Sequence, residues 1–237
     1  MKTLFVLLNA SKFGPALWSS LSIVASIWAY ALLYGWRFAA GFVGLIFIHE
    51  MGHYLAAMRR GLPVSLPMFI PFLGAFIALK DQPKDAETEA YVAYAGPLVG
   101  SLAAFACYYV WRNGGGPIWL ALANSGLILN LFNLIPLSPL DGGRITAVLS
   151  PRIWFLGVPI LLGVWSYFPS PMLILIAVFA LPQLLAAWRY DPKAPENIAY
   201  YNVPLSVKLE YTTLYIGLAV ILGLMINELH NTNPQKF

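Results

Sequence analysis

Seven apolar segments constrain the fold of this chain more than any other feature of its sequence. A helix needs about 20 apolar residues to cross the hydrocarbon core of a bilayer. Of the 237 residues, 59% are hydrophobic and 10% are charged, against roughly 25% charged residues in soluble domains. We therefore expect an all-α polytopic membrane protein with six to seven transmembrane helices. The fifth and sixth segments are short and joined through prolines, which favours a tight helical hairpin. The segments cover residues 16–35, 37–58, 89–111, 117–136, 153–168, 171–188 and 207–229.

A proline-rich stretch near residues 62–79 interrupts the helical pattern. Each proline removes a backbone donor and clashes with the preceding turn, and three fall here: Pro63, Pro67 and Pro71. Phe69-Ile70 and Phe76-Ile77 flank a turn-forming sequence, which favours two short strands. Non-helical backbone at membrane depth survives only where protein or a water-filled cavity covers it. We expect a re-entrant β-hairpin-like loop next to the second apolar segment, with an interfacial proline-rich loop as the alternative.

The basic residues are distributed unevenly between the two ends of the apolar segments. When alternate connections are assigned to opposite sides, eleven lysines and arginines fall on one side and three on the other. The richer side is expected to be cytoplasmic, together with the N-terminus. It holds Lys2, Lys12, Arg59, Arg60, Lys80, Lys84, Arg144, Arg152, Arg189, Lys193 and Lys208, and the other holds Arg37, Arg112 and Lys236. The net charge of +4 is dispersed over segment ends, which indicates contact with the lipid bilayer and no nucleic-acid binding.

Two of the three histidines lie four residues apart within the second apolar segment, in the sequence His49-Glu50-Met51-Gly52-His53. Positions four apart share one face of an α-helix, so both imidazoles can reach one metal ion. Glu50 is rotated by roughly 100° from His49, so it can reach a metal-bound water without ligating the ion. The alternative is a pair of helix-packing histidines, but two imidazoles and a carboxylate without a role are costly in hydrocarbon. The pattern indicates a catalytic zinc site.

A catalytic zinc ion takes three protein ligands and leaves one position for water, so the two histidines need a third ligand beside them. The acidic connection that contains Asp81, Asp85, Glu87 and Glu89 is expected to be solvated. Asp141 lies at the end of the fourth segment, after prolines that stop the helix and before two glycines that permit backbone conformations closed to other residues. An unwound segment there could turn the carboxylate into the bundle. Asp141 is the favoured third ligand, and a solvated aspartate at a helix end is the alternative.

These motifs resemble those of the site-2 protease family of intramembrane zinc metalloproteases. An HExxH motif in one transmembrane helix is followed two helices later by an NxxPxxPLDGG segment, which here runs from Asn133 to Gly143. Ala95-Gly96-Pro97, in the helix between them, resembles the AGP segment of the same proteins. The resemblance covers residues 37–150 and implies a catalytic core there. Residues 153–229 would add further helices to a single membrane-embedded metalloprotease domain over residues 1–237.

The resemblance implies that the chain hydrolyses a peptide bond in or near a transmembrane segment of a membrane protein substrate, as in regulated intramembrane proteolysis. By position in the motifs, His49, His53 and Asp141 would bind one zinc ion per chain. Glu50 would be the catalytic base, and Asn133 would lie close to the metal. The chain resembles short prokaryotic-type members without PDZ or CBS domains. We therefore expect a multi-pass protein of a prokaryotic cell membrane whose active site opens to the cytoplasm.

Asn133 and the hairpin have roles that their chemistry suggests. Asn133 can donate hydrogen bonds to an oxyanion or to the substrate backbone, or it can form an interhelical hydrogen bond between buried amides, with Asn130 nearby. A helical substrate must unwind to be cut, and the hairpin near residues 62–79 could pair its edge with the extended chain.

A membrane zinc transporter that uses the same ligands is the main alternative function. Transport requires polar residues toward both faces, yet residues 38–44 in the outer half of the second segment offer no ligand. A membrane protease for prenylated tails would need a glutamate ligand in a soluble zinc domain, and an inactive scaffold would not need every ligand. The single cysteine, Cys107, excludes an internal disulfide. The sequence indicates no particular oligomeric state.

Overall fold

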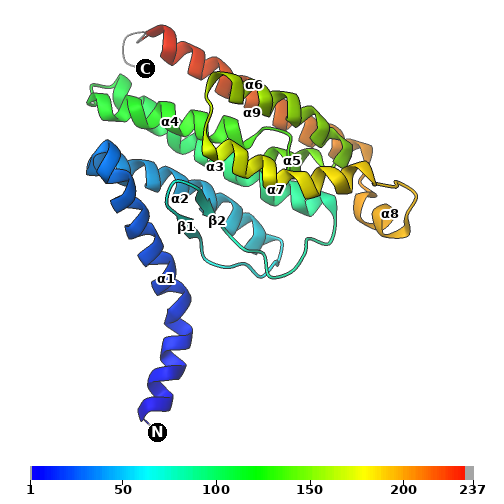
Figure 1. Ribbon diagram of the computed structural model, residues 1–237, viewed down its shortest axis with the longest axis horizontal. Helices are drawn as coiled ribbons and strands as arrows, with labels where there is room; N and C mark the ends of the chain where they lie inside the picture. The colour runs from blue at the N-terminus through cyan, green and yellow to red at the C-terminus, as the bar shows by residue number, and fades with distance from the viewer. Residues whose placement is uncertain (1, 233–237) are drawn as a thin grey trace.

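The computed structural model describes residues 2–232, with side chains from residue 14 onward, and it is mostly helical (Figure 1). Five helices of the described part are long and apolar enough to cross a membrane, so the chain is an integral membrane protein. They are α1 (Lys2–Tyr34, with its apolar part at Gly14–Tyr34), α2 (Trp36–Arg59), α3 (Ala86–Arg112), α7 (Pro171–Trp188) and α9 (Leu205–Thr232).

Two predicted spans form shorter helices. The fourth apolar segment gives α4 (Pro117–Asn133), which has 17 residues. The fifth gives a 3-10 helix, η1 (Pro151–Leu156), followed by α6 (Gly157–Tyr167) of 11 residues. At 1.5 Å per residue α6 is about 16 Å long, roughly half of the hydrocarbon core, so it cannot cross a bilayer alone.

The tight hairpin predicted for the fifth and sixth segments is wrong. Instead of packing closely on each other, α6 and α7 both contact η1. Trp154 of η1, Leu161 of α6 and Leu173 of α7 share one apolar cluster. The 3-10 helix therefore supports both helices.

Helix α3 lies at the centre of the fold, in contact with α2, α4, α9 and the short helix α5 (Asp141–Thr146). Its closest approach to α2 is set by Gly52, because a Cβ there would lie 2.5 Å from the carbonyl oxygen of Ala95. Small residues at such crossings let helix backbones come close together in a membrane, where apolar burial drives helix packing only weakly. The close crossing brings the polar residues of α2 against α3.

The proline-rich stretch forms the β-hairpin that the sequence predicts. Strand β1 (Met68–Ile70) pairs with β2 (Gly74–Phe76) in antiparallel register, with Phe69 opposite Ala75. Phe69 is buried against Val43 and Ile46 of α2, and β1 also contacts α1. Protein therefore covers the hairpin on two sides.

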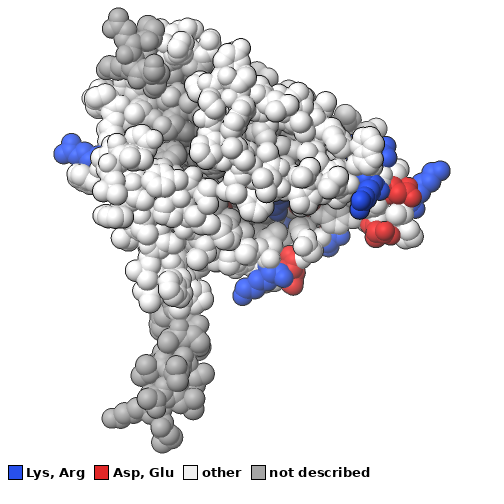
Figure 2. All heavy atoms as spheres, in the orientation of Figure 1, with Lys and Arg blue, Asp and Glu red and all other residues white. Residues whose placement is uncertain are grey.

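Charged side chains gather at one end of the molecule, around the short helix α8 (Pro195–Tyr201) (Figures 1 and 2). The visible middle of the molecule is almost free of them (Figure 2). We refer to the end that holds α8 and the N-terminus of α3 as the charged end. The distribution agrees with the uneven placement of basic residues along the sequence. Lys236 lies outside the described residues, as do the side chains of Lys2 and Lys12.

Candidate metal centre

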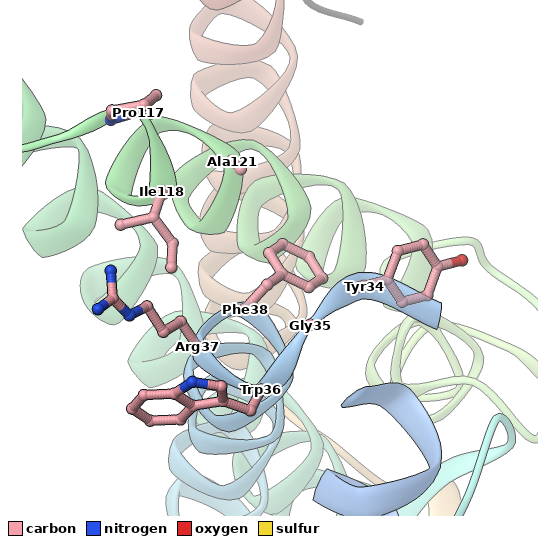
Figure 3. Close-up of a pocket in the computed structure, with 8 residues that line it drawn as sticks. All are labelled: Tyr34, Gly35, Trp36, Arg37, Phe38, Pro117, Ile118 and Ala121. Carbon is pink, nitrogen blue, oxygen red and sulfur yellow. The ribbon is translucent and has the colours of Figure 1, made fainter. Parts of the chain in front are cut away.

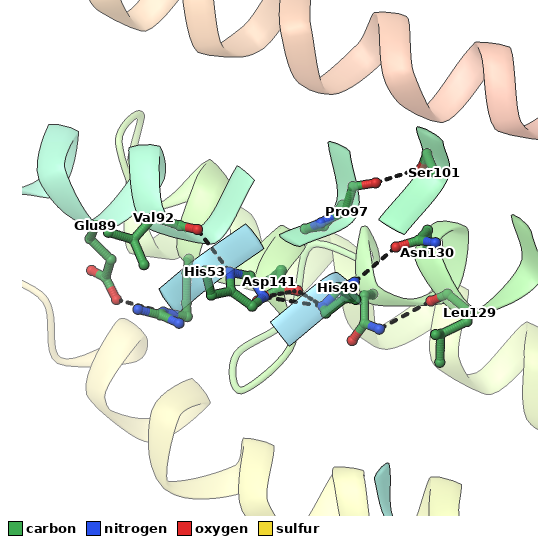
Figure 4. A network of polar contacts seen from close by, with 11 residues as sticks. His49, His53, Glu89, Val92, Pro97, Ser101, Leu129, Asn130 and Asp141 are labelled. Carbon is green, nitrogen blue, oxygen red and sulfur yellow. Dashed lines mark hydrogen bonds and ion pairs between the residues drawn. The ribbon is translucent and has the colours of Figure 1, made fainter. Parts of the chain in front are cut away.

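His49 and His53 of α2 meet Asp141, the first residue of α5 (Figure 4). Asp141 Oδ2 lies 3.1 Å from His49 Nε2 and 3.1 Å from His53 Nε2, and the two Nε2 atoms are 3.1 Å apart. All three residues are buried, with exposed fractions of 4%, 4% and 8%. The structure thus brings the three predicted ligands to one point, and the alternative of a solvated Asp141 is excluded.

The hydrogen-bond partners of the two imidazoles fix where their protons lie. His53 Nδ1 is 2.8 Å from the carbonyl oxygen of Val92, which can only accept, so this nitrogen carries the proton. His49 Nδ1 is 2.8 Å from Asn130 Oδ1, while the Asn130 amide nitrogen donates to the carbonyl of Gly126. In neutral imidazoles both Nε2 atoms then direct lone pairs at each other and at the carboxylate. Three acceptors converge without a donor, an arrangement that a cation stabilises.

The spacing of these three atoms fits a zinc ion. With bonds of about 2.0–2.1 Å to nitrogen and oxygen, a tetrahedral ion separates its ligand atoms by about 3.3–3.4 Å. The separations in this site are 3.1 Å. Two imidazoles and one carboxylate are also a donor set typical of a catalytic zinc site, which leaves a fourth position for water. The cluster could therefore hold one metal ion.

Two glycines of α3 make room for this polar cluster. A Cβ on Gly96 would lie within 2.7 Å of three ring atoms of His53. A Cβ on Gly100 would lie within 3.0 Å of three side-chain atoms of Asn130. Since ordinary contacts of a Cβ begin at 3.4 Å, only glycine lets α2 and α4 place these side chains against α3. The Ala95-Gly96-Pro97 motif therefore has a steric role at His53.

The turn between α4 and α5 directs Asp141 toward the histidines. The sequence predicts that Gly142 and Gly143 supply unusual backbone conformations, and this reason is wrong, because both are helical and neither has a positive φ. They are required for close packing instead. A Cβ on Gly142 would lie within 2.5 Å of the backbone of Leu134 and Ile135, and one on Gly143 would meet the backbone of the same turn. The short helix therefore sits directly on the turn, and its first carboxylate faces the bundle.

The cluster opens into a cavity of about 610 Å³, walled by α2, the hairpin, the turn before α5, and α7. Glu50 and Asn133 line it beside the three predicted ligands. Asn133 donates to the carbonyl of Leu129 in its own helix at 3.1 Å. The interhelical hydrogen bond considered for Asn133 is made by Asn130 instead. The residues predicted to carry the chemistry thus share one cavity.

Glu89 is not solvated in the way that the acidic connection suggests. Glu89 Oε1 lies 3.2 Å from Arg144 Nε, and Tyr200 of α8 donates to Glu89 Oε2 at 2.6 Å. Glu87 pairs with Arg60 at 3.2 Å. Burial, together with the charge of Glu89, raises the pKa of Tyr200, so its hydroxyl stays protonated and remains a donor. These contacts join α3 to α5 and α8 beside the metal cluster.

A second hollow, of about 560 Å³, lies where α1 meets α2 and the start of α4 (Figure 3). It is lined by Tyr34, Gly35, Trp36, Arg37, Phe38, Pro117, Ile118 and Ala121. None of these residues is a histidine, cysteine, aspartate or glutamate. The hollow therefore offers neither a metal ligand of these types nor a carboxylate or imidazole for proton transfer.

Part of this chain is similar to known proteins. The model of the family described as "Peptidase family M50" matches residues 37–117, which include His49, Glu50, His53 and Gly96. The zinc metalloprotease MJ0392 of Methanocaldococcus jannaschii is 34% identical over 122 residues, which cover 48% of this chain and 34% of the relative. Over residues 37–117 the chain is similar to peptidase family M50, and it is homologous to a zinc metalloprotease.

A second relative and a solved structure also match this chain in part. Rip3 of Mycobacterium tuberculosis is 29% identical over 151 residues, which cover 54% of this chain and 36% of Rip3. The matched regions thus amount to 34% of MJ0392 and 36% of Rip3. A solved structure, the site-2 protease from Methanocaldococcus jannaschii, is 25% identical with a TM-score of 0.44, covering 70% of this chain and 85% of that chain.

Two groups that hydrogen-bond to the histidines of the cluster were not predicted from the sequence. Asn130 accepts from His49, and the Val92 carbonyl accepts from His53. The sequence could have indicated Asn130, since an amide inside an apolar helix is costly without a partner. It could not have indicated Val92, because Val92 acts through its backbone carbonyl. Such partners orient a ligating imidazole and fix its tautomer.

Proposed function

We propose that this chain is an intramembrane zinc metalloendopeptidase that hydrolyses a peptide bond in or near a transmembrane segment of a membrane protein substrate. The observation that carries the proposal is the convergence of His49, His53 and Asp141 in a buried cluster, with Glu50 in the same cavity. These three side chains would hold one zinc ion per chain. Glu50 is the base rather than a fourth ligand.

The residues of the cavity divide the chemistry between them. A zinc ion bound here supplies Lewis acidity and lowers the pKa of water from 15.7 to about 7. Glu50 follows His49 directly and is rotated by roughly 100° around α2. It accepts the proton of the attacking water and returns it to the leaving nitrogen. Asn133 uses one amide hydrogen for Leu129, and we assign the other to the oxygen of the scissile carbonyl.

Strand β2 is the proposed pairing edge for the unwound substrate. The outer edge of β1 is occupied by α1, since Phe69 N–H donates to Ser22 Oγ at 3.1 Å and Ser19 Oγ donates to the Pro67 carbonyl at 2.6 Å. Phe69 therefore points its N–H away from β2. Ala75 is opposite Phe69, so it points its own N–H and C=O away from β1. Ala75 lines the metal cavity, where these groups can pair with an extended chain.

We propose that the whole chain forms one membrane domain with six to seven crossings. α4 contributes a crossing beside the five long helices, since its 17 residues extend about 26 Å. A seventh crossing would require η1 and α6 together. The N-terminus and the opening of the cavity lie on the cytoplasmic side, because the charged end carries most of the basic residues.

Cysteine labelling tests this topology in a Cys107→Ala background. Lys84 has a side chain that is 77% exposed, and Lys84→Cys should react with membrane-impermeant thiol reagents only in inside-out vesicles. A Cβ added at Gly116 would meet no atom within 4 Å, and Gly116→Cys should react only from the outer face. Labelling of Lys84→Cys from outside would reverse the proposed orientation.

A cleavage assay tests the proposed activity and separates it from zinc transport. Substrates are trapped with Glu50→Gln in the native membrane, identified by mass spectrometry, and reconstituted in liposomes with the wild-type chain. New termini in or next to a transmembrane segment, absent with Glu50→Gln, are expected. Zinc flux without cleavage would establish the transporter instead. The outer half of α2 argues against transport, since Phe38 and Phe42 stack there at 5.7 Å.

A further inference from the structure

Arg144 is the one lysine or arginine among the described residues that line the metal cavity. It lies three residues after Asp141 on α5. Residues three apart share a helix face, with about 5–6 Å between their Cβ atoms. Arg144 therefore follows the proposed zinc ligand along the same wall. The carboxylates of Asp141 and Glu50 already have roles in the proposed mechanism, whereas the guanidinium has none.

One side of the guanidinium is anchored. Arg144 Nε lies 3.2 Å from Glu89 Oε1, and Glu89 Oε2 accepts from Tyr200 at 2.6 Å. The side chains of Arg144 and Glu89 are 25% and 22% exposed, so the pair is largely shielded from solvent. Through this anchor α3 and α8 fix the direction of the arginine. The planar fork keeps further N–H donors on its two terminal nitrogens, in the geometry that a carboxylate accepts in a bidentate manner.

The anchor also locates Arg144 relative to the proposed zinc site. Glu89 precedes Val92, the backbone partner of His53, by three residues on α3. Three residues correspond to about 4.5 Å along a helix axis, and the N-terminus of α3 points to the charged end. Arg144 therefore lies on the side of the proposed zinc site that faces the charged end.

We propose that Arg144 is a specificity-determining residue that binds a carboxylate side chain of the substrate, a role that rests on the proposed function. An extended chain rises about 3.3 Å per residue. Given the Cβ separation of about 5–6 Å and the length of an arginine, the acidic residue lies about two to four residues from the scissile bond. It lies on the side of the charged end. Substrates with Asp or Glu there are preferred over those with Gln or Lys.

The test measures binding to the inactive Glu50→Gln protein in nanodiscs. The probes are synthetic Leu/Ala transmembrane peptides in which one Glu is moved along the half that faces the charged end, each with a Gln twin. At one register the Glu peptide should bind about tenfold more tightly than its twin, as expected for a charge-assisted hydrogen bond. Adding Arg144→Gln should abolish this preference, and adding Arg144→Glu should create a preference for Lys.

Arg60→Gln is the matched control, because Arg60 pairs with Glu87 at the same 3.2 Å but does not line the cavity. It should leave the preference intact. Zinc content verifies each variant, and Arg144→Lys replaces Arg144→Gln if the latter loses zinc. The Lys variant should retain a weaker preference for Glu, and a preference for Gln would overturn the proposal.

Equal binding of Glu and Gln peptides at every register would also overturn the role of Arg144, as would a preference that survives Arg144→Gln. These measurements do not depend on catalysis. Failure of the wild-type chain to cleave any membrane substrate would refute the proposed function and leave the peptide preference as a separate result.

Discussion

Gly96→Ala should remove zinc from the site while the chain stays folded. The new methyl carbon would lie 2.2 Å from His53 Nε2, the atom expected to bind zinc, against 3.4 Å for an ordinary contact. The ring would have to retreat by the difference, about 1.2 Å, and a zinc–nitrogen bond tolerates only about 0.2 Å. His53 would also lose its alignment with the Val92 carbonyl, now at 2.8 Å. Loss of an outer partner alone costs 10–100-fold in metal affinity, so displacement of the ligand should cost more than about 100-fold.

The stability of the folded state should fall less than the zinc affinity. Alanine is favoured over glycine within a helix by about 1 kcal/mol, which offsets part of the cost of crowding. Zinc affinity is measured by competition with a chromophoric chelator, and folding by size-exclusion chromatography and circular dichroism in detergent. Gly44→Ala, in α2, is the matched control, since a Cβ added there would meet no atom within 4 Å. It should bind zinc like the wild type. Wild-type affinity in Gly96→Ala would refute the steric reasoning and the placement of His53.

Two further substitutions test the groups around the metal. Asn130→Ala leaves His49 Nδ1 without its acceptor and should weaken zinc binding by about 10–100-fold. Asn133→Ala should keep the zinc affinity, because the Asn133 amide bonds only within α4 in the described contacts. Chelator competition measures both proteins, and equal affinities would remove Asn130 from its orienting role. Asp141→Asn should lower zinc affinity far more than Asp81→Asn in the α2–α3 connection, and matching values from the same titration would exclude Asp141 as a ligand.

Helix periodicity made the histidine pair predictable. His49 and His53 are four residues apart on one helix, so their shared face follows from local geometry alone. Asp141 was reachable by elimination among the few carboxylates of an apolar chain. The hairpin was predictable because prolines and paired apolar residues signal short strands locally.

Local sequence patterns did not predict the contacts between segments that are far apart in the chain. The acidic run before α3 resembles a solvated connection, yet Glu89 meets Arg144 and Tyr200, which follow it by 55 and 111 residues. Gly142 looked like a residue chosen for conformational freedom, but its backbone is helical and its lack of a side chain serves packing on the preceding turn. In the same way, the shortness of α6 depends on the 3-10 helix that replaces its first turns. Each of these features depends on which segments contact each other in the fold, and the spacing of residues along the chain does not predict those contacts.

Metal analysis of three purified proteins tests the central claim most directly. The wild type and Glu50→Gln should each contain about one zinc ion per chain, because three ligands are intact in both and Glu50 is not one of them. The double variant His49→Ala/His53→Ala should contain almost none, since only Asp141 of the three ligands remains. Full zinc occupancy in the double variant, or loss of zinc in Glu50→Gln, would contradict the assignment of the metal centre.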